Sequence, residues 1–301
     1  MKMKRREFIK KSAVGAGGLL LGAGLAAAAA EAAAKYHDPY AMVPLGKTGL
    51  KFTRICMGTG THGGGRNSDQ TRKGRAELQQ MIHTAYDRGI RTYDMADLYG
   101  SHSYVAEALT GLPRDSFSLI SKIWWSDGGI PEGERPDADV VVARFLKELK
   151  TDYIDLLLLH CVQEPNWPQQ LRRQMDILSK LKTEGKIKAL GVSCHSLGAL
   201  EAAATEPWVE SVHTRINPYG MSMDGTAEEV VPVLKKIHAA GKGVVGMKII
   251  GEGRLRNDDA RRDESVKFAL QSGCVDVLNV GFQTVEEMDD LAARVRKVPV
   301  V

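Results

Sequence analysis

The segment YIDLLLLH, residues 153–160, is the clearest indication of how this chain folds. Its apolar residues follow one another without polar alternation, which is typical of a parallel strand buried on both faces of its sheet. Seven more short apolar runs occur along the chain, with amphipathic stretches between them. The eight predicted strands are Phe52–Met57, Arg91–Met95, Ser118–Ile123, Tyr153–His160, Ile187–Ser193, Ser211–Asn217, Val244–Ile250 and Val275–Val280.

The stretches between these strands have the spacing of amphipathic helices. In Ala138–Leu149 the apolar residues recur every three or four positions, as on the buried face of a helix. Eight alternating strand and helix units favour an α/β fold, a single-domain (β/α)8 TIM barrel over residues 35–301. A doubly wound parallel sheet is the alternative, because the pattern alone does not show closure. Leu45–Leu50 precedes the first strand and predicts a small hairpin that covers one barrel end.

The first 34 residues have a different character. Residues 4–10 read KRREFIK, and an uncharged, Ala- and Gly-rich run follows from Ser12 to Ala30. A basic start, a weakly apolar run and small residues at the end predict a signal peptide over residues 1–34. The Arg5–Arg6 pair resembles a twin-arginine (Tat) signal, which implies export to the periplasm or beyond by the Tat machinery. An uncleaved inner-membrane anchor is the alternative.

The charge of the chain is concentrated in that segment. The whole chain carries 41 Lys and Arg against 37 Asp and Glu, and is 43% hydrophobic and 26% charged. This composition excludes wholesale disorder and a polytopic membrane protein. Residues 1–34 hold six basic and two acidic side chains, so the remainder is formally neutral. Because a nucleic-acid interface needs clustered cations, we expect no nucleic-acid partner.

Four polar side chains stand where three successive predicted strands end. Asp94 and Tyr99 follow the second strand, Lys122 ends the third and His160 ends the fourth. In a TIM barrel the carboxyl ends of the strands meet on one face, and the catalytic groups of such enzymes lie there. We therefore expect these four side chains to lie close together.

At these residues the sequence resembles the aldo-keto reductases, which are NAD(P)H-dependent carbonyl reductases built on a TIM barrel. The resemblance covers about residues 42–296, and it implies that Asp94, Tyr99, Lys122 and His160 form the catalytic tetrad. The segments that carry it are DMADLYG at 94–100, Lys122, His160, LGKTGL at 45–50, Met57–Thr59 and Gly191–Ser193.

The chemistry of these residue types suits that activity. A phenol has a pKa near 10, and an adjacent lysine ammonium is expected to lower the pKa of Tyr99. Asp94 would keep Lys122 charged and oriented. His160 would donate to the carbonyl oxygen of an aldehyde or ketone as negative charge develops there. Tyr99 would then give its proton to that oxygen while hydride adds to the carbon.

The resemblance also implies which residues contact the cofactor. They are Gly58, Thr59, Ser193, Cys194, His213, Met247, Lys248, Gly251, Gly253 and Arg254. Cys194 stands where the family usually has Asn, His213 where it has Gln, and Met247 where an aromatic ring stacks on nicotinamide. Residues 281–290 are acidic where many members hold the 2′-phosphate of NADP with Lys or Arg. The sequence therefore leaves NADP(H) and NAD(H) both open.

Three tryptophans are candidates for the wall of the substrate pocket. Trp124 and Trp125 begin a long loop after the third strand, and Trp167 follows the fourth. Aromatic side chains on such loops commonly line pockets. Packing on the barrel rim is the alternative for Trp125.

The cysteines give no sign of a metal site. The four cysteines contain no C-x-x-C pair, so we expect no bound metal and four buried thiols. A disulfide between Cys161 and Cys194 is the alternative, because an oxidising periplasm permits one. His62, beside Gly63–Gly65, is read as part of a glycine-rich loop.

Two functions follow from these patterns. The first is reduction of an aldehyde or ketone with NAD(P)H, with Tyr99 as proton donor. The alternative is a nucleotide-binding regulatory or interaction module on the same barrel with little or no turnover. The substitutions at Cys194, His213 and Met247 motivate that alternative.

Overall fold

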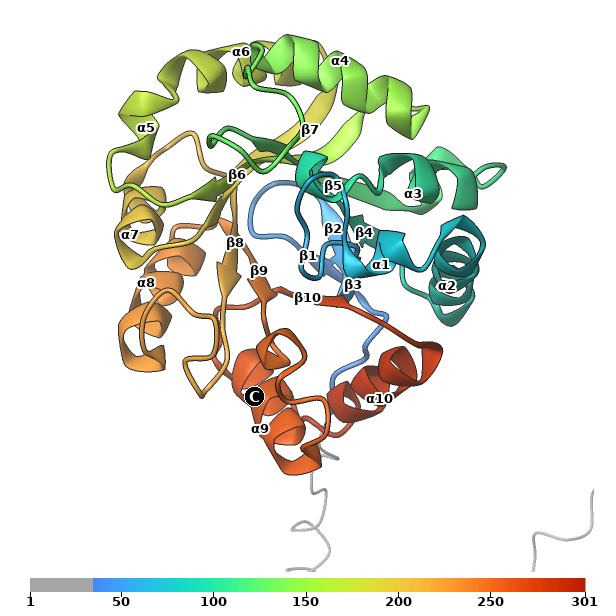
Figure 1. Cartoon of the computed structure of the whole chain (residues 1–301). Coiled ribbons are helices and arrows are strands. Elements are labelled where there is room, and N and C mark those ends of the chain that lie inside the picture. Colours follow the sequence, from blue (N-terminus) through green and yellow to red (C-terminus); the bar gives the residue numbers. More distant parts are fainter. Residues whose placement is uncertain (1–34, 301) are drawn as a thin grey trace, which may run out of the picture. The chain divides into compact units, whose positions relative to one another are not determined.

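The computed structural model describes residues 35–300, so the predicted signal peptide at residues 1–34 lies outside the described residues. Eight parallel strands form a closed barrel in the order β10-β3-β4-β5-β6-β7-β8-β9, with helices around it (Figure 1). The predicted barrel is confirmed, and closure by pairing of β10 with β3 excludes the doubly wound sheet. The barrel strands are β3 (Ile55–Gly58), β4 (Thr92–Asp94), β5 (Ser118–Trp124), β6 (Ile154–Val162), β7 (Ile187–Cys194), β8 (Ser211–Arg215), β9 (Gly243–Met247) and β10 (Val277–Gly281).

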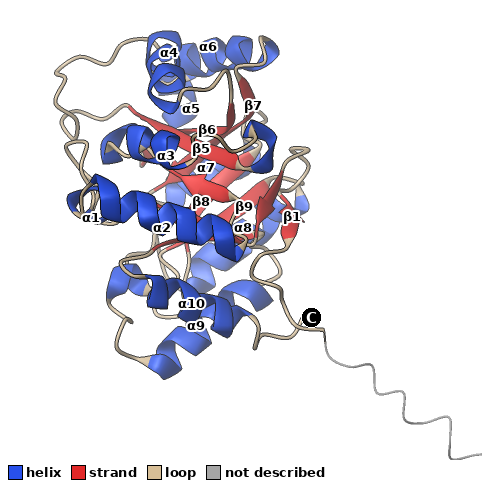
Figure 2. Cartoon of the chain, turned by 90° about the vertical axis from the view of Figure 1, so that its right-hand side faces the viewer, coloured by secondary structure: helices blue, strands red, loops and turns tan. Residues whose placement is uncertain are grey.

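The first predicted strand is divided in two. Lys51–Thr53 forms β2, which pairs antiparallel with β1 (Met42–Pro44), whereas the barrel strand β3 begins at Ile55. Leu45–Leu50, predicted as a small hairpin, is the connection between β1 and β2, so the hairpin extends beyond it on both sides. In the side view β1 lies at one end of the barrel (Figure 2), where the side chains of this hairpin enter the barrel interior.

The helices fill the connections between strands. Their bounds are α1 (Asp69–Arg72), α2 (Arg75–Arg88), α3 (His102–Ala108), α4 (Ala138–Leu149), α5 (Trp167–Gln170), α6 (Arg172–Thr183), α7 (Leu197–Thr205), α8 (Ala227–Ala239), α9 (Asp259–Gln271) and α10 (Val285–Val295), with 3-10 turns η1 (Asp97–Tyr99), η2 (Arg114–Ser116) and η3 (Gly251–Gly253). Helix α4 follows the predicted pattern, since Val141, Phe145 and Leu149 are buried against the barrel. It ends at Lys150, whose left-handed backbone (φ 51°) closes the last turn. No helix within residues 35–300 has both the length and the apolar character needed to cross a bilayer.

The barrel interior changes from apolar to polar along the strands. Side chains alternate, so Leu156 and Leu158 of β6 point inward and the next inward position is His160. The inner apolar cluster comprises Leu45, Phe52, Cys56, Ile120, Leu156, Leu158, Ala189, Val245 and Val277. The hairpin side chains Leu45 and Phe52 close it at the amino-terminal end. The polar layer therefore lies at the carboxyl-terminal end, where a TIM barrel carries its chemistry.

Candidate active site

The four residues expected to act together lie at the carboxyl-terminal end of the barrel. Asp94 is the last residue of β4, and Tyr99 ends the short η1 turn that follows it. Lys122 and His160 point inward from β5 and β6. The side chains of Asp94, Lys122 and His160 are almost fully buried, whereas Tyr99 is partly exposed at a cavity.

Direct contacts join these side chains in two pairs. The Lys122 ammonium donates to the Asp94 carboxylate and to the carbonyl oxygen of Met95, 2.8 Å away. The Tyr99 hydroxyl lies 3.2 Å from Nε2 of His160. Nζ of Lys122 lies 5.0 Å from the centre of the Tyr99 ring. The structure thus brings all four predicted residues into one cluster.

The Tyr99 hydroxyl differs in one respect from the sequence expectation. Desolvation raises the pKa of Tyr99 well above its ordinary value, and the charge of Asp94 adds to the effect. The Lys122 ammonium, which is paired with Asp94 and bonded to the carbonyl of Met95, does not overcome these two effects. Tyr99 therefore holds its proton in this state. We attribute the difference first to the burial of the phenol and second to the charge of Asp94, which acts on the phenol against that of Lys122.

His160 is neutral in this environment. Desolvation lowers the pKa of His160 well below its ordinary value, and the nearby Lys122, His195 and His213 lower it further. A neutral imidazole next to a protonated phenol can share one hydrogen bond with it in either direction. This pair can offer two hydrogen-bond donors to a substrate oxygen without placing a second cation beside Lys122.

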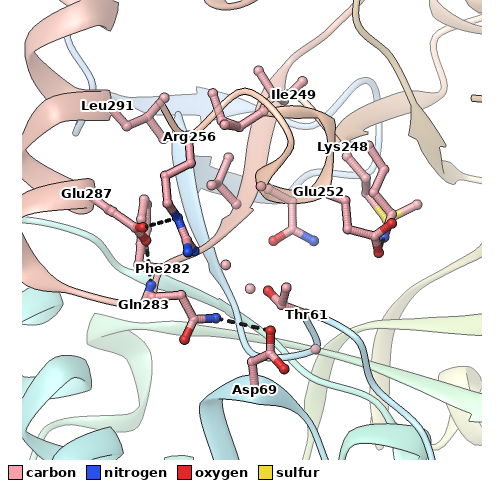
Figure 3. Close-up of a pocket in the computed structure, with 18 of the residues that line it drawn as sticks. Thr61, Asp69, Lys248, Ile249, Glu252, Arg256, Phe282, Gln283, Glu287 and Leu291 are labelled. Carbon is pink, nitrogen blue, oxygen red and sulfur yellow. Dashed lines mark hydrogen bonds and ion pairs between the residues drawn. The ribbon is translucent and has the colours of Figure 1, made fainter. Parts of the chain in front are cut away.

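A cavity of about 610 Å³ opens beside Tyr99. It begins at Gly58, Asp94, Tyr99 and Asn279 on the barrel and extends between the loop after β9 and helix α10. Its outer part is strongly charged, and Figure 3 shows Arg256 and Glu287 paired there at 2.8 Å. The other charged residues in this part of the lining are Asp69, Lys248, Glu252, Arg254, Arg262 and Asp290.

The volume and the lining residues of this cavity fit a dinucleotide. The volume lies within the range of ordinary ligand pockets. Arg254 offers a cation for a diphosphate, and Lys248 carries a second one that is paired with Glu252. Met247 offers an apolar surface near the barrel. Gly253 lines the same wall without a side chain. Of the residues predicted to contact the cofactor, Gly58, Met247, Lys248, Gly253 and Arg254 line the cavity.

The other predicted cofactor residues do not line it. The Thr59 hydroxyl donates to the carbonyl of Asp94, and the Ser193 hydroxyl accepts from the backbone N–H of Cys161. Cys194 is fully buried, with its thiol directed at the carbonyl of Ala199. The last two are His213, which is fully buried in the barrel interior, and Gly251, which is buried in η3.

The tryptophans are placed differently from one another. Trp124 packs edge-on against His160, with ring centres 5.5 Å apart, and its indole donates to the carbonyl of Gly128. Trp125 packs against the core, which was the alternative for this residue. Trp167 is 1% exposed and its indole donates to the carbonyl of Ala199. Of the three, only Trp124 is therefore placed beside the cluster, whereas the Trp167 side chain is buried at the start of α5.

All four cysteines are free thiols, so the Cys161–Cys194 disulfide is not formed. The Cys161 thiol lies 3.4 Å from Nε2 of His195. His62 pairs with Asp69 at 2.7 Å. Within residues 35–300 no group of three or more His, Cys, Asp or Glu side chains is arranged to hold a metal ion.

Several lining residues were not predicted from the sequence. Asn279 donates through Nδ2 to the Asp94 carboxylate. The available signal for it was a polar residue between the apolar Leu278 and Val280, near the end of a predicted strand. Arg256, Arg262 and Glu287 carry no comparable signal, because charged residues in loops and at helix starts are common on any surface.

Two glycines in the loop after β3 give a test of how Tyr99 is held. A Cβ on Gly60 would overlap the Tyr99 ring, whereas a Cβ on Gly64 meets nothing within 4 Å. Gly60→Ala should displace the phenol and lower kcat by about 10²-fold, since small misplacements of a reacting group are costly. Gly64→Ala is the matched control and should retain wild-type kcat. Equal kcat in both variants would show that the loop does not position Tyr99.

Comparison with known proteins gives one consistent result. The model of the family described as "Aldo/keto reductase family" matches residues 54–300. The chain is 29% identical over 234 residues to the aldo-keto reductase YhdN of Bacillus subtilis, an alignment that covers 72% of this chain and 67% of YhdN. It is 30% identical over 174 residues to the NADH-specific methylglyoxal reductase of Escherichia coli, covering 50% of this chain and 51% of that protein.

Solved structures share the fold. An aldo/keto reductase from Klebsiella pneumoniae, in complex with NADP and acetate, superposes with a TM-score of 0.62 at 22% identity. The match covers 85% of this chain and 90% of that chain. Among the curated relatives, the matched part spans between about half and two thirds of their length.

Proposed function

The chain belongs to the aldo/keto reductase family, and from this premise we propose that it reduces an aldehyde or ketone to an alcohol with NAD(P)H. The observation that carries the proposal is the Tyr99–His160 pair, 3.2 Å apart, at the inner end of a cavity that fits a dinucleotide. Protonated Tyr99 and neutral His160 suit donation to a carbonyl oxygen. The Lys122–Asp94 pair lies directly behind them.

Each residue has a part in that reaction. A bound nicotinamide supplies the hydride. The Tyr99 and His160 side chains hold the carbonyl oxygen and stabilise the negative charge that develops on it. Tyr99 gives its proton to that oxygen. The Lys122 ammonium favours the resulting phenolate, and Asp94 keeps Lys122 charged and oriented.

The test is turnover by the purified full chain. A panel of aldehydes and ketones, including methylglyoxal because one relative is named for it, is offered with NADH and with NADPH. We expect oxidation of at least one cofactor above the rate in buffer. Tight nucleotide binding with no turnover of any carbonyl would favour the alternative, a nucleotide-binding module without chemistry.

The choice between NADH and NADPH stays open. One relative is named for NADH, and one solved structure holds NADP. Because the reacting ring belongs beside Tyr99, we expect the adenosine end of the cofactor in the outer part of the cavity. The Arg256–Glu287 pair in that part therefore bears on the choice.

Glu287→Gln should shift cofactor preference towards NADPH. The change releases Arg256 and removes a negative charge that would repel a 2′-phosphate dianion. Since the pair is partly exposed, we expect the ratio of the two dissociation constants to shift by about 5- to 10-fold. Fluorescence titration measures both constants. Glu286→Gln, in the same turn of α10 but outside the cavity lining, is the control. An unchanged ratio would rule out this role for Glu287.

We also propose that residues 1–34 are a Tat signal that sends the protein to the periplasm. The support is the Arg5–Arg6 pair followed by an uncharged run from Ser12 to Ala30. Replacing both arginines by lysine should keep the full chain in the cytoplasm, as measured by cell fractionation. Equal export of the double variant would contradict a Tat route, and membrane-bound wild-type protein would support an uncleaved anchor.

A further inference from the structure

The carboxylate of Asp94 has a partner that the four-residue cluster does not include. Lys122 donates to Oδ1, and Asn279 of β10 donates through Nδ2 to Oδ2. We propose that Asn279 is a positioning residue, which holds Asp94 ionised and oriented so that Lys122 stays charged behind Tyr99. This inference rests on the proposed carbonyl reduction and extends it to a residue outside the tetrad.

Barrel closure is what brings Asn279 to Asp94. Strand β3 lies between β10 and β4, and Gly58 pairs with Asp94 on one side and with Gly281 on the other. A Cβ on Gly58 would lie 2.8 Å from Oδ1 of Asn279. The absence of a side chain at Gly58 therefore leaves the space through which Asn279 reaches across β3 to the carboxylate.

The Asn279 side-chain amide is only half satisfied in its position beside Asp94. Oδ1 of Asn279 is buried and has no hydrogen-bond partner among the described residues. An unpaired buried acceptor destabilises a fold, whereas an apolar side chain of similar size would not. The donor half of the amide is the part that makes a bond. An amide that satisfies Asp94 while its own acceptor stays unpaired is better explained by the chemistry of Asp94 than by packing.

The groups around Asp94 show why one donor matters. Lys122, Cys56, Tyr99 and His213 face this carboxylate from β5, β3, η1 and β8. Of these, only Lys122 donates to it. Nε2 of His213 lies 3.8 Å from Oδ2, beyond hydrogen-bond reach, and is neutral because desolvation lowers the pKa of His213.

Burial raises the pKa of Asp94, whereas Lys122 and Asn279 lower it. Without the Asn279 donor, Oδ2 would lose its hydrogen bond in a fully desolvated place, and the protonated carboxyl would be favoured. Lys122 would then lack the anion that orients its ammonium. The cation that favours the Tyr99 phenolate would no longer be held in place behind it.

The test compares Asn279→Leu, which removes the donor, with Asn279→Asp, which keeps the shape. For Asn279→Leu we expect kcat to fall by about 10- to 100-fold at low pH, the usual worth of a hydrogen bond to a charged group, and the loss to shrink as the pH rises and Asp94 ionises. In Asn279→Asp a protonated carboxyl can donate to Asp94 as the amide did. We therefore expect kcat near the wild-type value at low pH and a progressive loss as the pH rises and that proton leaves.

The controls separate this role from binding and folding. Cofactor dissociation constants are measured by fluorescence for both variants, and kcat is compared at saturating cofactor, because Asn279 also lines the cavity. Asn257→Asp adds the same charge on an exposed part of the loop before α9 and should leave the pH profile unchanged. Wild-type kcat in Asn279→Leu at saturating cofactor, or a pH-independent loss in Asn279→Asp, would each overturn the proposal.

A readout without turnover separates this inference from the proposed function. A carboxyl whose folded pKa is raised contributes stability at low pH that is lost as the pH rises through that pKa. Asn279→Leu should raise the pKa of Asp94 further, so its melting temperature should fall more between pH 4 and pH 7 than that of wild type. An equal fall in both proteins would overturn the role of Asn279 even if the enzyme reduces no carbonyl in the panel.

Discussion

Tyr99→Phe should lower kcat for carbonyl reduction by about 10²- to 10⁴-fold, because general acid catalysis contributes that much. The hydroxyl lies 3.2 Å from His160, whose imidazole is neutral and would have to supply the proton alone. The ring remains, so the cavity wall and cofactor affinity should be unchanged. Steady-state kinetics together with fluorescence titration of the cofactor measure the two effects.

A second tyrosine provides the matched control. Tyr93 lies in the same strand-to-turn segment, is fully buried, and its hydroxyl donates to the carbonyl of Ile90 at 3.3 Å. Tyr93→Phe removes an identical group outside the cavity and should leave kcat at the wild-type level. If Tyr99→Phe keeps wild-type kcat, Tyr99 is not the proton donor.

Lys122→Met should destabilise the fold and abolish most activity together. The Lys122 and Asp94 side chains are 0% and 3% exposed, so removing the ammonium leaves a carboxylate in a desolvated site. Breaking such a pair typically costs about 3–5 kcal/mol. Asp94 would then take up a proton. The loss measured by urea unfolding should therefore be smaller at pH 4 than at pH 8, since a raised folded pKa means stability is lost as the pH rises.

Two further variants separate the charge from the volume. Lys122→Met combined with Asp94→Asn leaves no buried charge, so most of the stability should return while kcat stays low. Lys147→Met, at an exposed position of α4, should change neither quantity. If Lys122→Met alone is as stable as wild type at pH 8, Asp94 and Lys122 are not a buried ion pair in solution.

The strand pattern predicted the barrel because buried parallel strands leave a continuous apolar run, as in YIDLLLLH at residues 153–160. The same logic placed Asp94, Lys122 and His160 at strand ends. It did not separate Phe52 from the barrel strand, since a hairpin plug and a barrel strand are equally apolar at that point. The strand predicted over Val244–Ile250 was three residues too long at its end, since β9 stops at Met247. It stops there because Lys248 takes a left-handed backbone (φ 58°), which no composition rule reveals.

The parts of the site that could not be predicted from the sequence depend on closure of the barrel and on which groups each side chain contacts. Asn279 reaches Asp94 only because β10 pairs with β3, which joins the two ends of the barrel. The effect of Lys122 on Tyr99 could not be read from spacing either, since it depends on what else the ammonium contacts. The direction of the Ser193 side chain likewise depends on the local backbone geometry. In the structure its hydroxyl accepts from the backbone N–H of Cys161 and does not face the cavity.

The alternation along β6 has a consequence for how this sequence tolerates change over evolutionary time. Leu158 and His160 are successive inward positions of one strand, the first in the apolar cluster and the second in the polar layer. Truncating the first leaves a void that weakens the fold, whatever reaction the protein performs. Changing the second alters the reaction while most of the packing stays in place. Substitutions in the inner apolar cluster are thus limited by side-chain volume, and substitutions in the polar layer by charge. Residues of the polar layer can therefore change to suit a new substrate while the apolar cluster stays the same.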